Sequence, residues 1–150
     1  MWRDAGQQLR SIARWCALSL VLNLIWEIVQ LPLYTIPSES QVAYAVIHCT
    51  IGDAVIAAIT FVISALLLRN ADWPITDPWR GASVVMLLGV AYTGYSEWHS
   101  VYQAGYWGYT SSMPLVFGVG LAPLLQWIFV PTASILILGI RHIRSQSGSH

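Results

Sequence analysis

The segment Ala43–Leu68, AYAVIHCTIGDAVIAAITFVISALLL, decides the fold. Its single charged residue is Asp53, and its length exceeds the roughly 20 apolar residues that a helix needs to cross a bilayer. The rest of the chain agrees, because 56% of its 150 residues are hydrophobic and only 9% are charged. A soluble domain usually carries about 25% charged residues. The sequence therefore predicts an integral membrane protein.

Three further apolar segments have comparable lengths, and short polar or turn-rich stretches separate them. They are Trp15–Tyr34, Gly81–Val101 and Pro114–Ile140. The last contains Pro123 and Pro131, which we expect to bend it. No connection is long enough for a second domain. We therefore expect residues 1–150 to form one all-α domain, a transmembrane four-helix bundle.

The positive charges predict the orientation. All seven basic residues are Arg, and with four spans they fall on one side of the membrane: Arg3, Arg10, Arg14, Arg69, Arg80, Arg141 and Arg144. Short loops rich in Arg stay in the cytoplasm, so both termini are predicted to be cytoplasmic. The formal net charge is zero, and nothing in it indicates a nucleic-acid partner.

Three carboxyl groups, those of Glu27, Asp53 and Glu97, fall within or at the edge of these spans. A charged group at mid-bilayer costs a few kcal/mol, so such residues face the bundle interior, stay protonated or find partners. In the first span, polar residues recur at spacings of three and four, which places them on one helix face. They are Cys16, Ser19, Asn23, Glu27, Gln30 and Tyr34.

The second and third spans show related patterns. Asp53 shares a face with small and polar residues, namely Thr50, Ala57, Thr60 and Ser64, whereas His48 points elsewhere. In the third span, one face carries Thr93, Glu97 and Ser100, and another carries Tyr92, Ser96 and His99. With the predicted orientation, the polar groups of all spans lie within roughly 15 Å of the outer interface. We therefore expect a polar cavity there, covered by Tyr102, Trp107 and Met113.

Such a cavity suits proton transfer on a lipophilic molecule: isomerisation, cyclisation or hydration. In this hypothesis Glu27 and Glu97 act as acid and base, and Asp53 or His48 tunes them. The residues expected to orient these groups or contact the substrate are Asn23, Gln30, Tyr92, Trp98, Trp107 and Gln126.

Two other classes of function remain open. His48 and His99 lie at similar depth on different helices and would suit axial haem ligands in a haem- or lipid-binding accessory subunit. Intramembrane acids also mark proton- or ion-coupled carriers, which with four spans would need a homo-oligomer. HExxH and CxxC motifs are absent, so we predict no metal site, and the sequence identifies no cofactor.

Five motifs resemble those of a group of small, uncharacterised four-span proteins of the bacterial inner membrane. They are Trp26-Glu27-x-x-Gln30-Leu-Pro-Leu-Tyr34, His48-Cys-Thr-x-Gly-Asp53, Tyr92-Thr-x-x-Ser-Glu97-Trp98, Trp107-x-Tyr109 with Met113-Pro114, and Gly118-x-Gly-Leu-x-Pro-Leu-Leu-Gln126-Trp127. The resemblance implies the four-span fold and a multi-pass location in that membrane. It implies no reaction and no site residue.

Overall fold

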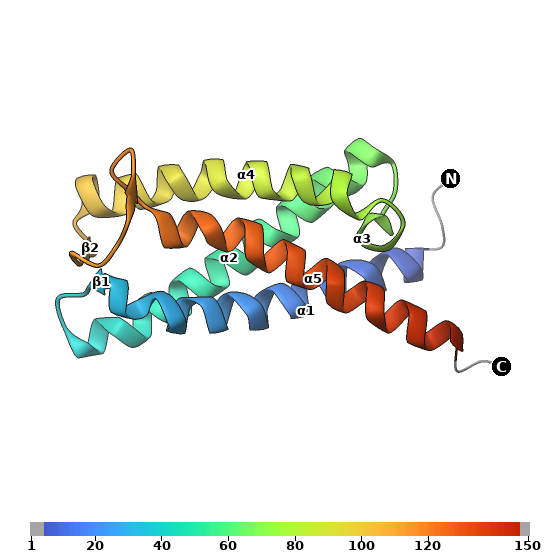
Figure 1. Cartoon of the computed structure of the whole chain (residues 1–150), viewed down its shortest axis with the longest axis horizontal. Coiled ribbons are helices and arrows are strands. Elements are labelled where there is room, and N and C mark those ends of the chain that lie inside the picture. Colours follow the sequence, from blue (N-terminus) through green and yellow to red (C-terminus); the bar gives the residue numbers. More distant parts are fainter. Residues whose placement is uncertain (1–4, 148–150) are drawn as a thin grey trace.

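The computed structural model describes the backbone of residues 5–147 and the side chains of residues 6–141. Four long helices run side by side as a bundle (Figure 1). They are α1 (Ala5–Gln30), α2 (Glu39–Leu68), α4 (Pro78–Trp98) and α5 (Leu121–Ser147), and a single turn, α3 (Trp73–Thr76), precedes α4. Each of α1 and α4 packs against both α2 and α5, which places the four helices around a common interior. The prediction of an all-α helical bundle is confirmed.

Three helices are long and apolar enough to cross a membrane by length and composition: Gly6–Leu33, Glu39–Leu68 and Leu121–Arg141. They cover the whole of the predicted second span and most of the predicted first and fourth spans. The predicted third span, Gly81–Val101, corresponds to α4, which is not one of these three helices. The coarse prediction of a multi-pass membrane protein therefore stands on three helices.

The boundaries of the first and fourth helices differ from those predicted. Helix α1 begins at Ala5 rather than Trp15, because its polar first turns continue the same helix. It ends at Gln30, and Pro32 then lies in a 3₁₀ turn, η1 (Leu31–Leu33).

Helix α5 begins at Leu121, so the prediction that the fourth span starts at Pro114 is wrong. The preceding residues form a hairpin of β3 (Leu115–Val116) and β4 (Val119–Gly120). Its turn residues Phe117 and Gly118 have φ values of 50° and 83°, which a helix cannot accommodate. Pro123 lies in the first turn of α5, where a missing N–H breaks no helical hydrogen bond, so Pro131 alone lies inside the helix.

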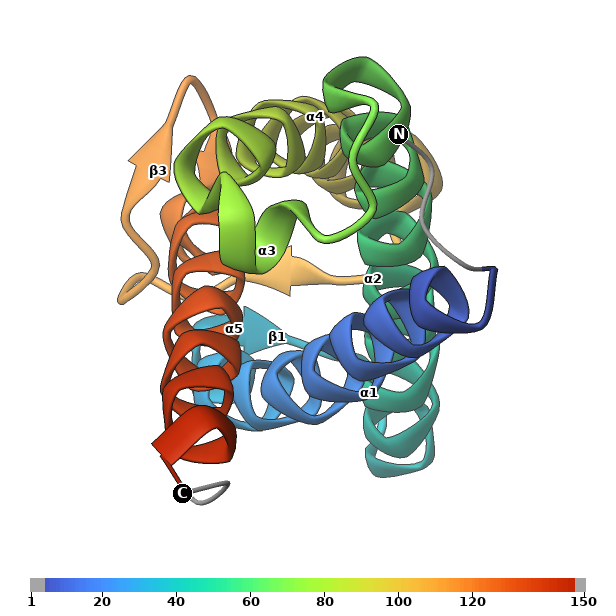
Figure 2. The same cartoon turned by 90° about the vertical axis from the view of Figure 1, so that its right-hand side faces the viewer.

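Aromatic side chains fill the bundle near the α2–α4 connection. Trp73 of α3 enters the interior, and its ring centroid lies 4.9 Å from that of Trp15 and 5.4 Å from that of Phe61. All three side chains are buried, and the Trp15 indole donates a hydrogen bond of 3.1 Å to the carbonyl of Ala57. We call Trp15, Phe61 and Trp73 the aromatic plug. Figure 2 shows α3 lying across this end of the bundle.

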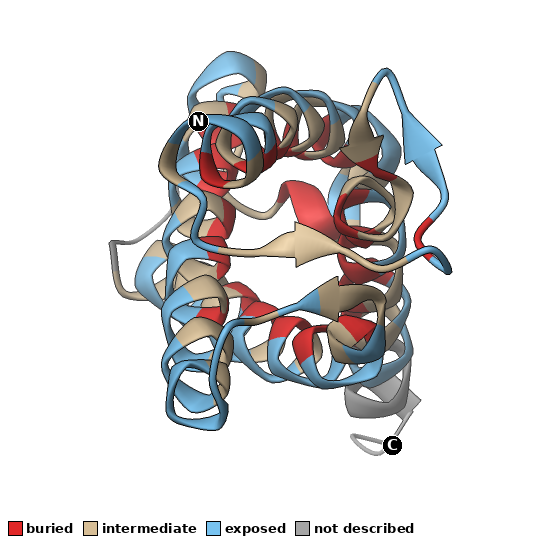
Figure 3. Ribbon diagram, turned by 90° about the vertical axis from the view of Figure 1, so that its left-hand side faces the viewer, coloured by how far each residue is buried: buried red, intermediate tan, exposed pale blue. Residues whose placement is uncertain are grey.

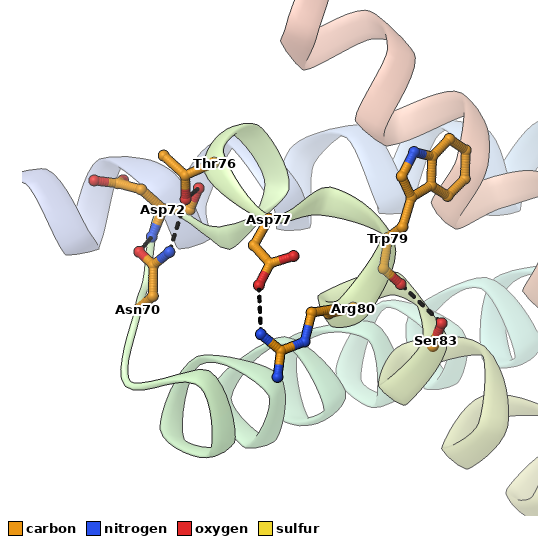
Figure 4. A network of polar contacts seen from close by, with 7 residues as sticks. All are labelled: Asn70, Asp72, Thr76, Asp77, Trp79, Arg80 and Ser83. Atoms are coloured by element: carbon orange, nitrogen blue, oxygen red, sulfur yellow. Dashed lines mark hydrogen bonds and ion pairs between the residues drawn. The ribbon is translucent and has the colours of Figure 1, made fainter.

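Polar contacts fix the connection that carries Trp73. The Asp72 carboxylate accepts hydrogen bonds from Gln7 and Ser11 of α1, at 3.0 and 2.6 Å. Figure 4 shows the neighbouring contacts, in which Asn70 accepts from the Asp72 N–H and donates to Thr76. These bonds join the first turns of α1 to the α2–α4 connection.

The same end of the bundle holds the chain ends and the arginines. Helix α1 begins and α5 ends there (Figure 1). Arg69 and Arg80 flank the α2–α4 connection, and Arg80 forms an exposed ion pair of 3.3 Å with Asp77. Arg3 and the side chain of Arg144 lie outside the described residues.

The close packing of α4 against α5 can be tested by substitution of Gly89. A Cβ at Gly89 would overlap the indole ring of Trp127, whereas a Cβ at Gly94 would meet only Leu124 at 3.9 Å. We expect Gly89→Ala to lower the free energy of unfolding by about 1–3 kcal/mol through overpacking. Gly94→Ala, on the same helix, should leave it unchanged or raise it. Unfolding in mixed detergent micelles measures both, and equal stability of the two variants would contradict this packing.

Candidate functional site

At the end of the bundle opposite the aromatic plug, two connections are joined by a short ladder. Strand β1 (Tyr34–Thr35), which follows α1, pairs antiparallel with β2 (Gly108–Tyr109) from the α4–α5 connection. Figure 3 shows these strands crossing the end of the bundle. Thr110 adds a backbone hydrogen bond of 3.0 Å to the carbonyl of Leu33. We call this ladder the strand bridge.

Beneath the strand bridge lies a cavity of about 400 Å³. Its walls come from α1, α2, α4, α5 and the two joined connections. Glu27, Asp53 and Glu97 all line it, and each is only 8–9% exposed. The structure therefore brings together the three carboxyl groups that the sequence placed inside the membrane.

Glu97 is bonded to the strand bridge. Its Oε2 atom accepts hydrogen bonds from the hydroxyl groups of Tyr34, at 3.1 Å, and Tyr109, at 2.8 Å. The pairing of Tyr34 with Tyr109 in the ladder places both donors on one oxygen atom. Burial raises the pKa of both phenols, and the negative charge of Glu97 raises it further, so both stay protonated and donate. Two phenol donors on one oxygen stabilise a carboxylate, and neither of them occupies its Oε1 atom.

Glu27 and Asp53 form a second carboxyl site. Both side chains line the cavity, and each accepts a hydrogen bond from an amide group. Gln30 donates a hydrogen bond of 2.8 Å to Glu27, and Gln126 donates one of 2.6 Å to Asp53. The cavity thus contains two carboxyls held by amide side chains and, separately, a carboxyl held by tyrosines.

Further hydrogen bonds hold the two glutamines that contact Glu27 and Asp53. The Gln126 Nε2 atom donates also to Asn23, at 2.8 Å, and the indole of Trp26 donates to Gln30 at 3.1 Å. Asn23 is 1% exposed and does not line the cavity. Its predicted contact with a substrate is therefore not supported by its position, and its observed role is to bind Gln126.

The other predicted site residues divide into two groups. Gln30, His48, Tyr92, Trp107 and Gln126 line the cavity. Trp98 does not, and its side chain is 44% exposed, because it follows Glu97 directly and points about 100° away around the helix.

The predicted cover of the cavity is corrected in part. Trp107 lines the cavity beside Tyr106, and its buried indole N–H has no hydrogen-bond partner among the described residues. Tyr102 and Met113 do not line it. Tyr102 instead donates a hydrogen bond of 2.7 Å to the carbonyl of Gly118 in the β3–β4 hairpin.

The two histidines proposed as haem ligands do not face one space. His48 lies at the edge of the cavity and stacks on Tyr44, with ring centroids 5.4 Å apart. His99 is exposed, does not line the cavity, and packs near Tyr95. Among the described residues, no group of three or more His, Cys, Asp or Glu side chains is arranged to hold a metal ion.

Sequence reasoning missed several residues of this site. Tyr34 was recognised as part of the polar face of α1, but not as a partner of Glu97. No periodic pattern marks Tyr109, because its position depends on strand pairing between residues far apart in the chain. Cys49 and Tyr44 also line the cavity and lie about one and a half turns apart on α2.

The cavity does not continue through the bundle. Its deepest lining residue on α2 is Ile56, and beyond it the aromatic plug fills the interior. Trp127 adds to this packing and donates a hydrogen bond of 2.6 Å to Thr93. The cavity is therefore blind toward the end that carries the arginines.

Comparison with known proteins offers no guide to the chemistry. No known protein family, curated protein or solved structure matches the chain. The resemblance to small four-span bacterial membrane proteins therefore stays a prediction, and function has to be argued from the cavity.

The tyrosine bonds to Glu97 can be tested by removing one hydroxyl at a time. We expect Tyr34→Phe and Tyr109→Phe each to lower the free energy of unfolding by about 1–2 kcal/mol, because a buried carboxyl loses a donor. Tyr95→Phe is the control, since Tyr95 is exposed on the same bundle end. If all three variants unfold at the same detergent fraction as the parent protein, the bonds to Glu97 contribute nothing to stability.

Proposed function

We propose that α4 is a fourth span and that both termini lie in the cytoplasm of a bacterium, with the protein in its inner membrane. Helix α4 has 21 residues and lies beside the three apolar helices, so at about 31 Å it matches the thickness of a bilayer core. Its polar residues Thr93 and Glu97 are buried. Arg69 and Arg80 lie at the end where α1 begins and α5 ends, which favours a cytoplasmic location for that end.

We propose further that the cavity is the active site of a membrane enzyme that moves protons on a lipophilic substrate. The observation that carries this proposal is the presence of two differently bonded carboxyl sites in one cavity. The Glu27–Asp53 pair holds a proton and serves as the acid. Glu97, held by Tyr34 and Tyr109, serves as the base through Oε1, the oxygen that neither tyrosine contacts.

The simplest reaction for such a site is the isomerisation of a carbon–carbon double bond. The pair donates its proton to one alkene carbon, and the positive charge develops on the other. Glu97 then removes a proton from the carbon next to that charge, so the double bond moves and the composition of the substrate is unchanged. Glu97 then releases its proton to water and the pair takes up a proton from water, which completes the cycle. Tyr92 and Trp107 line the cavity and would stabilise the cation through their ring faces.

The alternative functions differ in what they require of the cavity. A lipid-binding accessory subunit would use the same apolar walls without proton transfer. A proton-coupled carrier needs a path to both sides, and the aromatic plug fills the second half of the bundle. Axial haem ligation by His48 and His99 would require both imidazoles at one cavity, and His99 does not line it.

Deuterium exchange tests the proposed enzyme activity and does not require the substrate to be known. The protein is incubated in D₂O with bilayers made from total bacterial lipid, and the extracted lipids are examined by mass spectrometry. Because the acid takes its proton from water and the base removes one from carbon, we expect a neutral lipid to gain carbon-bound deuterium. Glu27→Gln and Glu97→Gln should each lower the rate by about 100-fold or more.

Glu39→Gln is the matched control, since Glu39 is exposed at the start of α2, outside the cavity. Full exchange by both cavity variants would overturn the acid–base assignment. A lipid that co-purifies without exchange would favour the binding subunit, and a Soret band in the absorption spectrum would favour haem binding.

The proposed orientation can be checked with reporters. We expect fusions of a cytoplasmically fluorescent protein to the C-terminus, and to the α2–α4 connection at Asp77, to be fluorescent. Insertion at Gly105, in the connection after α4, should instead give an active periplasmic phosphatase. Fluorescent fusion at Asp77 with an active phosphatase at the C-terminus would show that α4 or α5 does not cross.

A further inference from the structure

One wall of the cavity is open between α2 and α4. The lining residues His48 and Gly52 of α2 are exposed, and Tyr92 on the facing side of α4 is 53% exposed. By contrast, the lining residues from α1 and α5, Glu27 and Gln126, are buried. The cavity therefore reaches the surface of the bundle on its α2–α4 side.

Two features of the fold produce this opening. Helix α2 crosses the bundle obliquely, so it lies near α4 beside the aromatic plug and diverges from α4 toward the strand bridge (Figures 1 and 2). Gly52 then contributes no side chain to close the gap. A Cβ built at Gly52 would meet no atom within 4 Å, in contrast to Gly81 and Gly89, which are packed against Trp rings.

The surface around the opening is apolar. Ile51 and Val55 flank Gly52 on α2 and are exposed, and Leu87 of α4 is exposed one to two turns from Tyr92. Gly52 lies within Glu39–Leu68, one of the three helices long and apolar enough to span a membrane. An opening between such a helix and its neighbour, surrounded by exposed aliphatic residues, faces lipid rather than water.

The two ends of the bundle offer less direct access. The strand bridge lies across one end, and its Tyr34 and Tyr109 hydroxyls are committed to Glu97. The aromatic plug fills the other end. The lateral opening extends toward the strand bridge, where Tyr44 and Tyr106 also line the cavity and are exposed, and it requires neither structure to move.

We infer that the cavity takes its ligand sideways from the bilayer, through a portal bounded by His48, Gly52 and Tyr92. The ligand is an uncharged, lipid-soluble molecule, and 400 Å³ is within the range of pockets that hold one small organic molecule. The identity of the occupant as a substrate rests on the proposed function. The route itself does not.

Cys49 provides a native reporter of this route, because it lines the cavity one turn from Gly52. In a Cys16→Ser background, Cys49 is the single thiol of the chain. The protein is placed in lipid nanodiscs, where both membrane faces are accessible. It is then treated either with N-phenylmaleimide, which dissolves in the bilayer, or with a sulfonated phenylmaleimide, which stays in water. Mass spectrometry follows the addition of maleimide to the thiol.

We expect N-phenylmaleimide to label Cys49 at least about tenfold faster than the sulfonated reagent, after correction for their rates with a free thiol. Gly52→Phe should slow the neutral reagent by about tenfold, because its ring occupies the open gap. Gly139→Phe is the matched control, since a Cβ there also meets no atom within 4 Å but the site is on α5. Tyr92→Ala removes the facing wall and should speed labelling, an effect that local shielding of Cys49 by Phe would not produce.

Equal labelling by the two reagents would overturn the portal and indicate entry from water past the strand bridge. Equal rates in the Gly52→Phe and Gly139→Phe variants, or no acceleration in Tyr92→Ala, would do the same. Labelling of Cys49 requires no catalytic turnover. The labelling experiment can therefore contradict the portal without affecting the proposed enzyme activity, and deuterium exchange can contradict the activity without affecting the portal. Loss of exchange with intact lateral labelling would leave a lipid-binding cavity without catalysis.

Discussion

The burial of three carboxyl groups inside an apolar bundle is the constraint on which the rest of this structure depends. None of Glu27, Asp53 and Glu97 has an Arg or Lys partner among the described residues, so each needs hydrogen-bond donors or a shared proton. Those donors come from all parts of the fold: Gln30 on α1, Gln126 on α5, and the two tyrosines of the strand bridge. Satisfying the carboxyls therefore fixes the positions of the helices and of both connections above them.

The two ends of the bundle differ in their packing: aromatic side chains fill one end, and the cavity lies at the other. Near the α2–α4 connection, the aromatic plug packs without space, and a hydrogen-bonded Asp72 joins that connection to α1. Toward the strand bridge, α2 diverges from α4, and the cavity lies between them (Figure 1). A cavity lowers the free energy of unfolding, because its walls lose packing contacts. The apolar packing of the aromatic plug at the other end of the bundle offsets this loss. The glycines follow this division, with Gly81 and Gly89 under Trp rings and Gly52 beside open space.

Within the cavity, the bonding of each carboxyl determines what it can do. Glu27 and Asp53 accept hydrogen bonds from amide groups, whereas Glu97 accepts two phenol hydrogen bonds on one oxygen. In the proposed reaction this difference separates a proton donor from a proton acceptor, without a Lys or Arg among the residues that line the cavity. Access from the side of the membrane would bring apolar molecules to these groups while the strand bridge limits the entry of water, which would compete for the same protons.

Composition and helical periodicity determined the membrane-embedded helical bundle, the buried face of α1 and the small-residue face of α2, because each depends on residues near one another in the chain. Periodicity also identified Glu27, Asp53 and Glu97 as residues that must find partners, and the structure places them together. Their actual partners were decided by tertiary structure. Tyr34 and Tyr109 meet through strand pairing between residues 75 positions apart, and the opening at Gly52 arises from the angle at which α2 crosses the bundle. Neither the pairing nor the angle leaves a periodic signal in the sequence, and for the same reason the hairpin before α5 was taken as part of a span.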